Sequence, residues 1–174
     1  KAIVKILSVN FSYEIVKGAY ISNGFLNNQK EEDEIEIICN DLTYEEGVST
    51  GNIIQNVEGG IGKKQQFGKM ITSTIRKINK NTSIRSIYIG DSVTDILALM
   101  RADISIIIGS SSTLKEVIRI FDIKEKTIFN AILENSLEND LMSQEKIIYR
   151  AQSWFEIGFF LYDDSYYDFI THDI

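Results

Sequence analysis

The chain of 174 residues contains no proline and only one cysteine and one histidine. The single Cys39 excludes an intrachain disulfide framework and a zinc site built from several cysteines, and it fits a reducing compartment. We expect Cys39 to be a small buried side chain rather than a nucleophile. The lone His172 stands in a polar stretch and is expected to be solvated. The absence of proline beside many Ile, Asn and Lys residues indicates a compositional bias of the genome rather than a function.

Basic residues are also in deficit, with 18 Lys and Arg against 25 Asp and Glu and a formal net charge of −7. This charge disfavours binding to nucleic acid or to an anionic membrane through a general basic field. No apolar run is long enough to span a bilayer, and residues 1–4 have no signal-peptide layout. We therefore expect a cytoplasmic protein, or alternatively an organellar one, whose partner is a phosphorylated small molecule rather than nucleic acid or membrane.

From Lys63 onward, apolar patterns with helical and strand periods alternate along the chain. This order predicts an α/β fold, a three-layer Rossmann-like parallel sheet with helices on both faces. We expect one core domain over 1–161 and an acidic, aromatic tail over 162–174. The predicted helices are 63–79, 93–101, 114–121 and 144–161, and the predicted strands are 86–90, 104–108 and 127–132, with a loop at 134–140.

The first third of the chain has weaker patterns. Strands are predicted at 2–9 and 35–39 and a short one at 52–57, with a helical turn or two over 12–19. The polar segments 27–34 and 40–50 are predicted to be loops or turns, and the glycines of 59–62 a flexible joint.

Two acids follow the predicted strand that ends at Gly90. Asp91 and Asp95 stand four residues apart, a spacing that places two side chains on the same side of a helical turn. Ligands of an open parallel sheet bind beyond the carboxyl ends of its strands. The pair is therefore a candidate Mg²⁺ site, because Mg²⁺ takes a few carboxylates together with water and substrate oxygens. The alternative is a pair of helix N-terminal acids favoured by the helix dipole.

Three further residues are candidates for binding a phosphate group. Ser8 ends the first predicted strand, Asn10 follows it, and Lys63 precedes a predicted helix. A hydroxyl group and an ammonium group can donate charge-assisted hydrogen bonds to phosphate oxygens. The structural alternatives are an ordinary hydroxyl at the end of a strand and a solvated surface lysine.

The segment Gly90–Asp95, with Leu97, Ala102-Asp103 and Ile106–Gly109 after it, resembles the fourth motif of the haloacid dehalogenase-like (HAD) phosphatase superfamily. Over about Ile3 to Leu161 the chain resembles one branch of it, the HAD domain fused behind a TenA-like domain in plant thiamin monophosphate phosphatases. The segments that carry this resemblance are Ile6–Asn10, Tyr44–Gly51, Lys63 with Gln65 and Phe67, Ile107–Ser112 and Ser153–Ile157.

The resemblance implies a Mg²⁺-dependent phosphomonoester hydrolase, with thiamin monophosphate as the expected substrate and a TenA-like domain as the expected fusion partner. It implies that Ser8 binds the phosphoryl group and that Lys63, or its neighbour Lys64, neutralises charge on it. It also implies that Asp91 and Asp95 hold the metal ion, Asp91 more directly. In this superfamily an aspartate attacks phosphorus, and a second aspartate two residues later protonates the leaving group.

The sequence departs from the superfamily in one respect, because its first motif, Asp-x-Asp-x-Thr after a strand, is absent. We expect the nucleophile to lie upstream in a longer protein, and these 174 residues alone to be inactive and unstable. Two alternatives remain open. One is another HAD phosphatase, resembling a nucleotidase or phosphoserine phosphatase. The other is a non-catalytic module in a fusion protein, with Ser8–Asn10 as a decayed first motif.

Overall fold

The computed structural model describes residues 2–22, 35–78, 84–134, 136–143 and 145–162. It contains two compact units, one ending at Phe67 and the other beginning at Gly68, and each is described by itself. The predicted loop at 27–34 and most of the predicted tail lie outside the described residues. The prediction of one domain over 1–161 stays a prediction.

The first unit contains a short parallel pair of strands. Strand β1 (Lys5–Leu7) pairs with β2 (Glu36–Ile38), and helix α1 (Tyr13–Ser22) lies against β2. Both strands and the helix were predicted, although the strands are shorter than their apolar runs. Because the pair is parallel, the carboxyl ends of β1 and β2 lie at the same edge.

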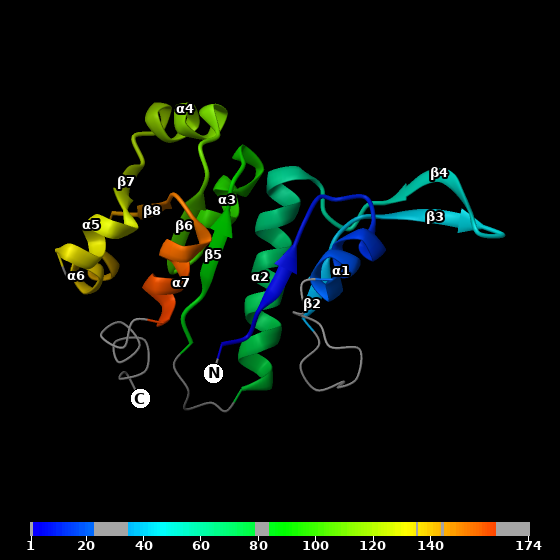
Figure 1. Cartoon of the computed structure of the whole chain (residues 1–174), viewed down its shortest axis with the longest axis horizontal. Helices are drawn as coiled ribbons and strands as arrows, with labels where there is room; N and C mark the ends of the chain where they lie inside the picture. Colours follow the sequence, from blue (N-terminus) through cyan, green and yellow to red (C-terminus); the bar gives the residue numbers. More distant parts are fainter. Residues whose placement is uncertain (1, 23–34, 79–83, 135, 144, 163–174) are drawn as a thin grey trace. The chain divides into compact units, whose positions relative to one another are not determined.

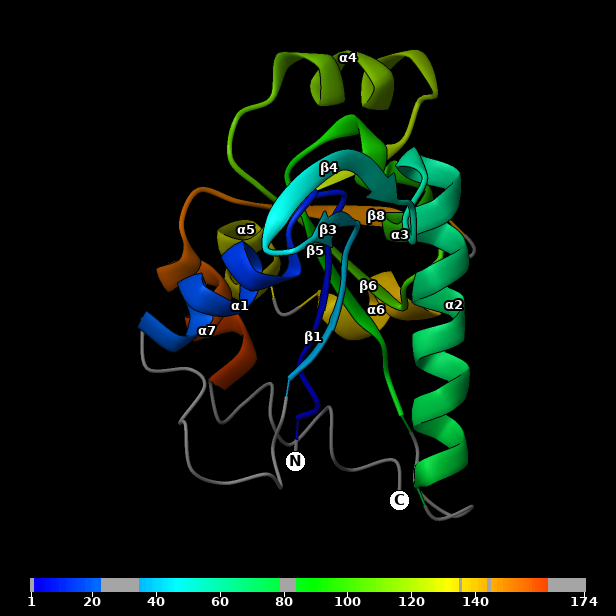
Figure 2. The ribbon, with the colours of Figure 1, turned by 90° about the vertical axis from the view of Figure 1, so that its right-hand side faces the viewer.

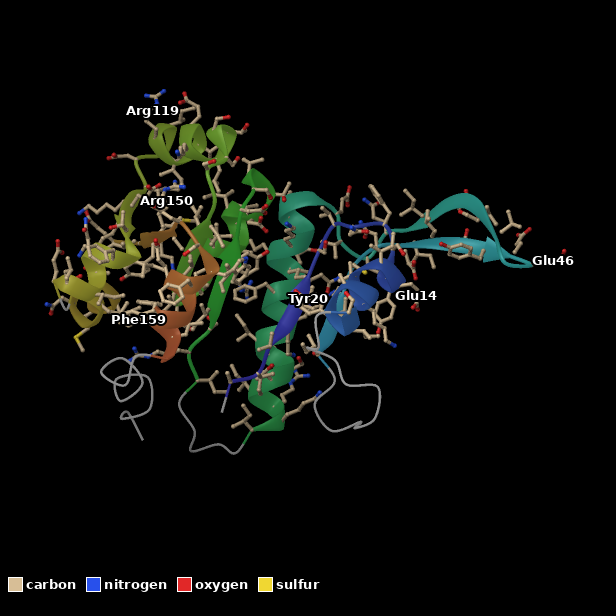
Figure 3. The ribbon with its side chains drawn as sticks, viewed as in Figure 1. Glu14, Tyr20, Glu46, Arg119, Arg150 and Phe159 are labelled. Carbon is tan, nitrogen blue, oxygen red and sulfur yellow. The ribbon has the colours of Figure 1, made fainter. Side chains whose placement is uncertain are left out.

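A β-hairpin follows where the sequence predicted turns over 40–50, so that prediction was wrong. Strand β3 (Asp41–Glu45) pairs antiparallel with β4 (Val48–Ile54), which includes part of the predicted strand at 52–57. Glu46, labelled at the tip of the hairpin in Figure 3, and the next residue, Gly47, both have positive φ, 50° and 82°. Two such residues make the tight turn whose twist matches that of paired strands. Figure 1 shows the hairpin extending away from α1 and β2.

Helix α2 (Gly59–Lys77) begins earlier than predicted, because the glycines expected to form a flexible joint form its first turn. Its buried side chains include Phe67 and Met70, which stand three residues apart and so lie on one side of the helix. The helix signal was therefore correct, and only its start was misjudged. Glycine lowers helix propensity but does not prevent a helix from beginning.

The second unit is built on a four-stranded parallel sheet in the order β5-β6-β8-β7. The strands are β5 (Ile87–Gly90), β6 (Ile104–Ile108), β7 (Lys124–Thr127) and β8 (Ile147–Ala151). Strand β8 was predicted as part of a helix over 144–161, which was wrong. It lies inside the sheet between β6 and β7, so its apolar residues are buried on both faces and have no clear period.

Helices flank this sheet. Helices α5 (Ile128–Leu133) and α7 (Trp154–Tyr162) contact each other and β8, whereas α3 (Ile96–Leu99) contacts β5 and β6. Figure 2 shows α5 and α7 on one side of the sheet and α3 on the other. The predicted α/β class with a Rossmann-like parallel sheet is confirmed. The remaining helices are α4 (Ser112–Ile120), α6 (Leu137–Met142) and the 3₁₀ turn η2 (Val93–Asp95).

The core of the second unit lies between the sheet and the α5–α7 side. The rings of Tyr149 and Phe160 are tilted 40° to each other, with centroids 5.8 Å apart. Trp154, the first residue of α7, is 65% exposed and lies outside this core. The buried cluster consists of Ile104, Ile106, Ile128, Ala131, Leu137, Tyr149, Ala151, Ile157 and Phe160.

Two further predictions for this unit were wrong. The strand predicted at 127–132 is mostly helix α5, and the loop predicted at 134–140 contains the start of helix α6.

Candidate functional site

The acidic loop after β5 is organised by the carboxylate of Asp95, which is 3% exposed. One oxygen, Oδ2, accepts hydrogen bonds from the backbone N–H groups of Asp91 (3.3 Å) and Ser92 (3.1 Å) and from the Ser92 hydroxyl (2.7 Å). The other oxygen, Oδ1, accepts a bond from the Tyr88 hydroxyl (2.8 Å). Both oxygens of Asp95 thus accept hydrogen bonds from donors that stand three to seven residues before it in the chain.

Gly90 makes room for this arrangement. A Cβ atom at this position would lie 2.6 Å from the Asp95 Cβ and 2.7 Å from its Cγ, which is closer than such atoms approach in proteins. The carboxyl end of β5 and the Asp95 side chain therefore fit together only because residue 90 has no side chain. This steric restriction explains why a glycine stands directly before Asp91 in the motif.

Tyr88 supplies a donor from inside β5, where its side chain is buried. Burial raises the pKa of the Tyr88 hydroxyl far above its ordinary value, and the nearby negative charge of Asp95 raises it further. The hydroxyl therefore stays protonated and donates to Asp95. Sequence analysis missed Tyr88, because a tyrosine in an apolar strand is typical of ordinary core packing.

Asp91 differs from Asp95 in every one of these respects. It is exposed, and among the residues that the structure describes its carboxylate accepts no hydrogen bond. A free carboxylate beside the carboxyl end of a parallel strand is suited to bind a hard cation. The described ranges contain no group of three or more His, Cys, Asp or Glu side chains that could hold a metal ion. A cation at Asp91 would therefore take other oxygens from water or a ligand.

Ser8 and Asn10 form a compact turn at the carboxyl end of β1. The Ser8 N–H donates to the Ile38 carbonyl (3.0 Å), and the Ser8 hydroxyl accepts from the Asn10 N–H (3.1 Å). The Asn10 side-chain oxygen accepts in turn from the Ser12 N–H (3.1 Å). Each side-chain oxygen accepts one hydrogen bond within the turn, and the Ser8 hydroxyl and the Asn10 amide group can still act as donors to a ligand.

Lys63 and Lys64 were alternatives for the charged residue, and the structure distinguishes them. Lys63 lies in the second turn of α2 and is 6% exposed, whereas Lys64 is exposed. Lysine is almost never buried to this degree unless it is paired. Lys63 is therefore the more specific position, and Lys64 has the environment of a solvated lysine.

The five predicted site residues fall into two groups. Ser8, Asn10 and Lys63 belong to the first unit, and Asp91 and Asp95 belong to the second. Ser8 and Asn10 lie beyond β1 and Asp91 lies beyond β5, whereas Lys63, predicted to precede a helix, lies in the second turn of α2. Their convergence on one ligand stays a prediction.

The serine run after β6 caps helix α4. The Ser111 hydroxyl accepts a hydrogen bond from the Leu114 N–H (3.3 Å) at the start of α4. Arg150 of β8 holds the preceding backbone by donating to the Gly109 carbonyl (3.1 Å), while its guanidinium forms a two-point ion pair with Glu125 of β7 (Figure 3). Arg150 thus fixes this loop to the two neighbouring strands.

These features define a class of protein: an α/β protein with a parallel sheet, an acidic loop beyond one strand and a hydroxyl-bearing turn beyond another. The chain is 33% identical over 162 residues to the bifunctional TH2 protein, mitochondrial, of Arabidopsis thaliana, a match that covers 89% of this chain. The chain spans 25% of the length of that relative. No family model and no solved structure matches the chain. In the described residues, no helix is long and apolar enough to cross a membrane.

Proposed function

We propose that these residues form part of a HAD-like, Mg²⁺-dependent phosphomonoester hydrolase that acts on thiamin monophosphate. The observation that carries the proposal is the loop after β5, in which Asp95 is held internally and Asp91 is left free at the strand end. The motif resemblance and the 33% identity to the TH2 protein support the same assignment. The substrate follows from the resemblance to the thiamin monophosphate phosphatase branch.

In this proposal the first unit binds the phosphoryl group. The Ser8 hydroxyl and the Asn10 amide donate hydrogen bonds to phosphate oxygens, and the Lys63 ammonium offsets their negative charge. The Ser8–Asn10 turn is already closed by its own hydrogen bonds, so its donors are ordered before a ligand arrives. Such preorganisation lowers the entropy cost of binding.

The second unit binds the metal ion. The oxygen chemistry of Asp91 fits Mg²⁺, which commonly takes one or two protein carboxylates and completes its shell with water and phosphate oxygens. Bound there, Mg²⁺ would neutralise charge on the phosphoryl oxygens. Asp95 would have to release one of its protein donors to become a direct ligand. We therefore assign Asp91 as the ligand and Asp95 as the residue that orients it.

The attacking carboxylate is proposed to come from a segment outside these 174 residues, because the sequence has no Asp-x-Asp-x-Thr motif. The relative is named bifunctional and is about four times as long as the matched part, which fits a fusion to another domain such as a TenA-like one. Its name also describes it as mitochondrial, which favours the organellar alternative for this protein.

The test is phosphate release by the full-length protein from thiamin monophosphate, phosphoserine and nucleoside monophosphates, each with Mg²⁺ or with EDTA. We expect Mg²⁺-dependent release with preference for thiamin monophosphate, and no turnover by the isolated 174 residues. Preference for phosphoserine or a nucleotide would move the protein to another HAD phosphatase class. No release from any substrate would indicate a non-catalytic module.

A further inference from the structure

The side chain of Asn40 is 4% exposed and makes four hydrogen bonds, all to backbone groups. Its Nδ2 group donates to the carbonyls of Val9 (3.2 Å) and Val57 (3.1 Å). Its Oδ1 atom accepts from the N–H groups of Asn56 (2.8 Å) and Val57 (2.7 Å). One amide at the end of β2 thus joins two segments, one 31 and the other 17 residues away.

Both joined segments carry proposed phosphate-binding residues. Val9 stands between Ser8 and Asn10, so its carbonyl is part of the turn that presents their donors. Asn56 and Val57 immediately precede α2, which begins at Gly59 and carries Lys63 in its second turn. Asn40 therefore links the turn after β1 to the start of the helix that carries the lysine, and all of these residues lie in the first unit.

Asparagine is well matched to this position. Its planar amide offers two donors on one atom and an acceptor with two lone pairs on the other, and all of them are used. An aspartate would place a second acceptor against the carbonyls of Val9 and Val57, and an alanine would leave the four backbone groups without their partner. Buried backbone groups without partners are costly, so the amide specifies one relative placement of the two segments.

We propose that Asn40 is a positioning residue that sets the Ser8–Asn10 turn against the start of α2, so that the two present their donors to one phosphate group. This inference rests on the proposed phosphatase function, which it extends by naming the residue that places the phosphate-binding half. Asn40 acts through the backbone of Val9 and Val57. Reactivity depends steeply on such placement, since a misplacement of about 1 Å can cost about 100-fold in rate.

The test compares Asn40→Asp and Asn40→Ala with Asn52→Asp in the full-length protein. Asn52→Asp is a control for the same change of side chain, because Asn52 is an exposed residue of β4 in the same unit and belongs to neither of the two joined segments. The measurements are kcat and KM for thiamin monophosphate, inhibition by inorganic phosphate, and the folded fraction by circular dichroism.

We expect both Asn40 variants to raise KM and the inhibition constant for phosphate by about tenfold or more when corrected for folded fraction, with Asn52→Asp within about twofold of the parent. Unchanged phosphate inhibition in folded Asn40 variants would overturn the proposal, and so would an equal loss in Asn52→Asp. A parent protein that releases no phosphate at all would instead refute the proposed function.

A measurement on the unmodified protein covers the case in which the Asn40 variants fail to fold. Amide hydrogen exchange is followed with and without inorganic phosphate. If Asn40 couples the two segments, phosphate should slow exchange at Asn56 and Val57 as well as at Asn10 and Ser12. Slowing confined to residues 10–12, or no slowing at either segment, would contradict the coupling.

Discussion

The two loops that carry the candidate site are held in opposite ways. The acidic loop after β5 is organised by a charged residue of its own motif, Asp95, which accepts hydrogen bonds from Tyr88, Asp91 and Ser92. The turn after β1 is held by a neutral amide from the connection between β2 and β3, Asn40, which stands 31 residues from Val9. The acidic loop is thus held by a residue of the same loop, whereas the turn after β1 is held by a residue from a distant segment of the chain.

The surroundings of the two loops explain this difference. The second unit has a continuous apolar core in which the strands next to the acidic loop are fully or largely buried. The first unit has few buried apolar side chains among its described residues, and every residue of β4 is exposed. Where apolar packing is sparse, directed hydrogen bonds such as those of Asn40 take a larger share in fixing geometry.

Replacing Asp95 gives the largest expected effect on stability. Asp95→Ala removes the acceptor of four donors, and we expect a loss of about 3 kcal/mol in the free energy of unfolding, measured by urea denaturation. Asp95→Asn should cost much less, because its oxygen can keep the three loop bonds while its amide donates to the Tyr88 hydroxyl, which is able to accept.

The pair of variants separates two roles of Asp95. If Asp95 mainly orients the loop, the Asn variant keeps most of the Mg²⁺ affinity of the protein. If Asp95 is itself a ligand, both variants should lose that affinity equally, and the contrast with Asn40 drawn above would no longer hold.

Gly90→Ala should have the next largest effect. The new methyl group would meet the Asp95 side chain at 2.6 Å, and we expect a loss of about 2 kcal/mol together with weaker Mg²⁺ binding. Gly158→Ala in α7 is the matched control, because a Cβ atom there meets no atom within 4 Å. It should stabilise the protein by about 0.5 to 1 kcal/mol. A neutral Gly90→Ala variant would show that the loop tolerates a shift of Asp95.

Tyr88→Phe should have the smallest effect of the three. It removes one donor from a buried carboxylate and leaves the three loop bonds intact, so we expect a loss of about 1 to 2 kcal/mol by urea denaturation. Mg²⁺ affinity should change little, since Asp91 is held by the other oxygen of Asp95. A large loss of Mg²⁺ affinity would mean that Tyr88 helps to fix the loop itself.

The same contrast between local and remote contacts explains what could be predicted from the sequence. The α/β class and the positions of Asp91 and Asp95 were predictable, because a strand, a glycine and two acids are adjacent in the chain. Strand β8 was not, because burial on both faces removes its two-residue period. The role of Asn40 was not predictable either, since nothing in the neighbouring sequence marks a polar residue whose four backbone partners belong to distant segments of the chain.

The measurement that tests the central claim most directly is the Mg²⁺ dependence of phosphate release by full-length Asp91→Asn, beside Glu116→Gln as a control. Glu116 is an exposed acid on α4 in the same unit, paired with Arg119 on the same helix. We predict that Asp91→Asn lowers the rate at least about 100-fold or raises the required Mg²⁺ concentration to a similar degree, while Glu116→Gln leaves both unchanged. An Asp91→Asn protein with the rate and Mg²⁺ requirement of the parent would contradict the account.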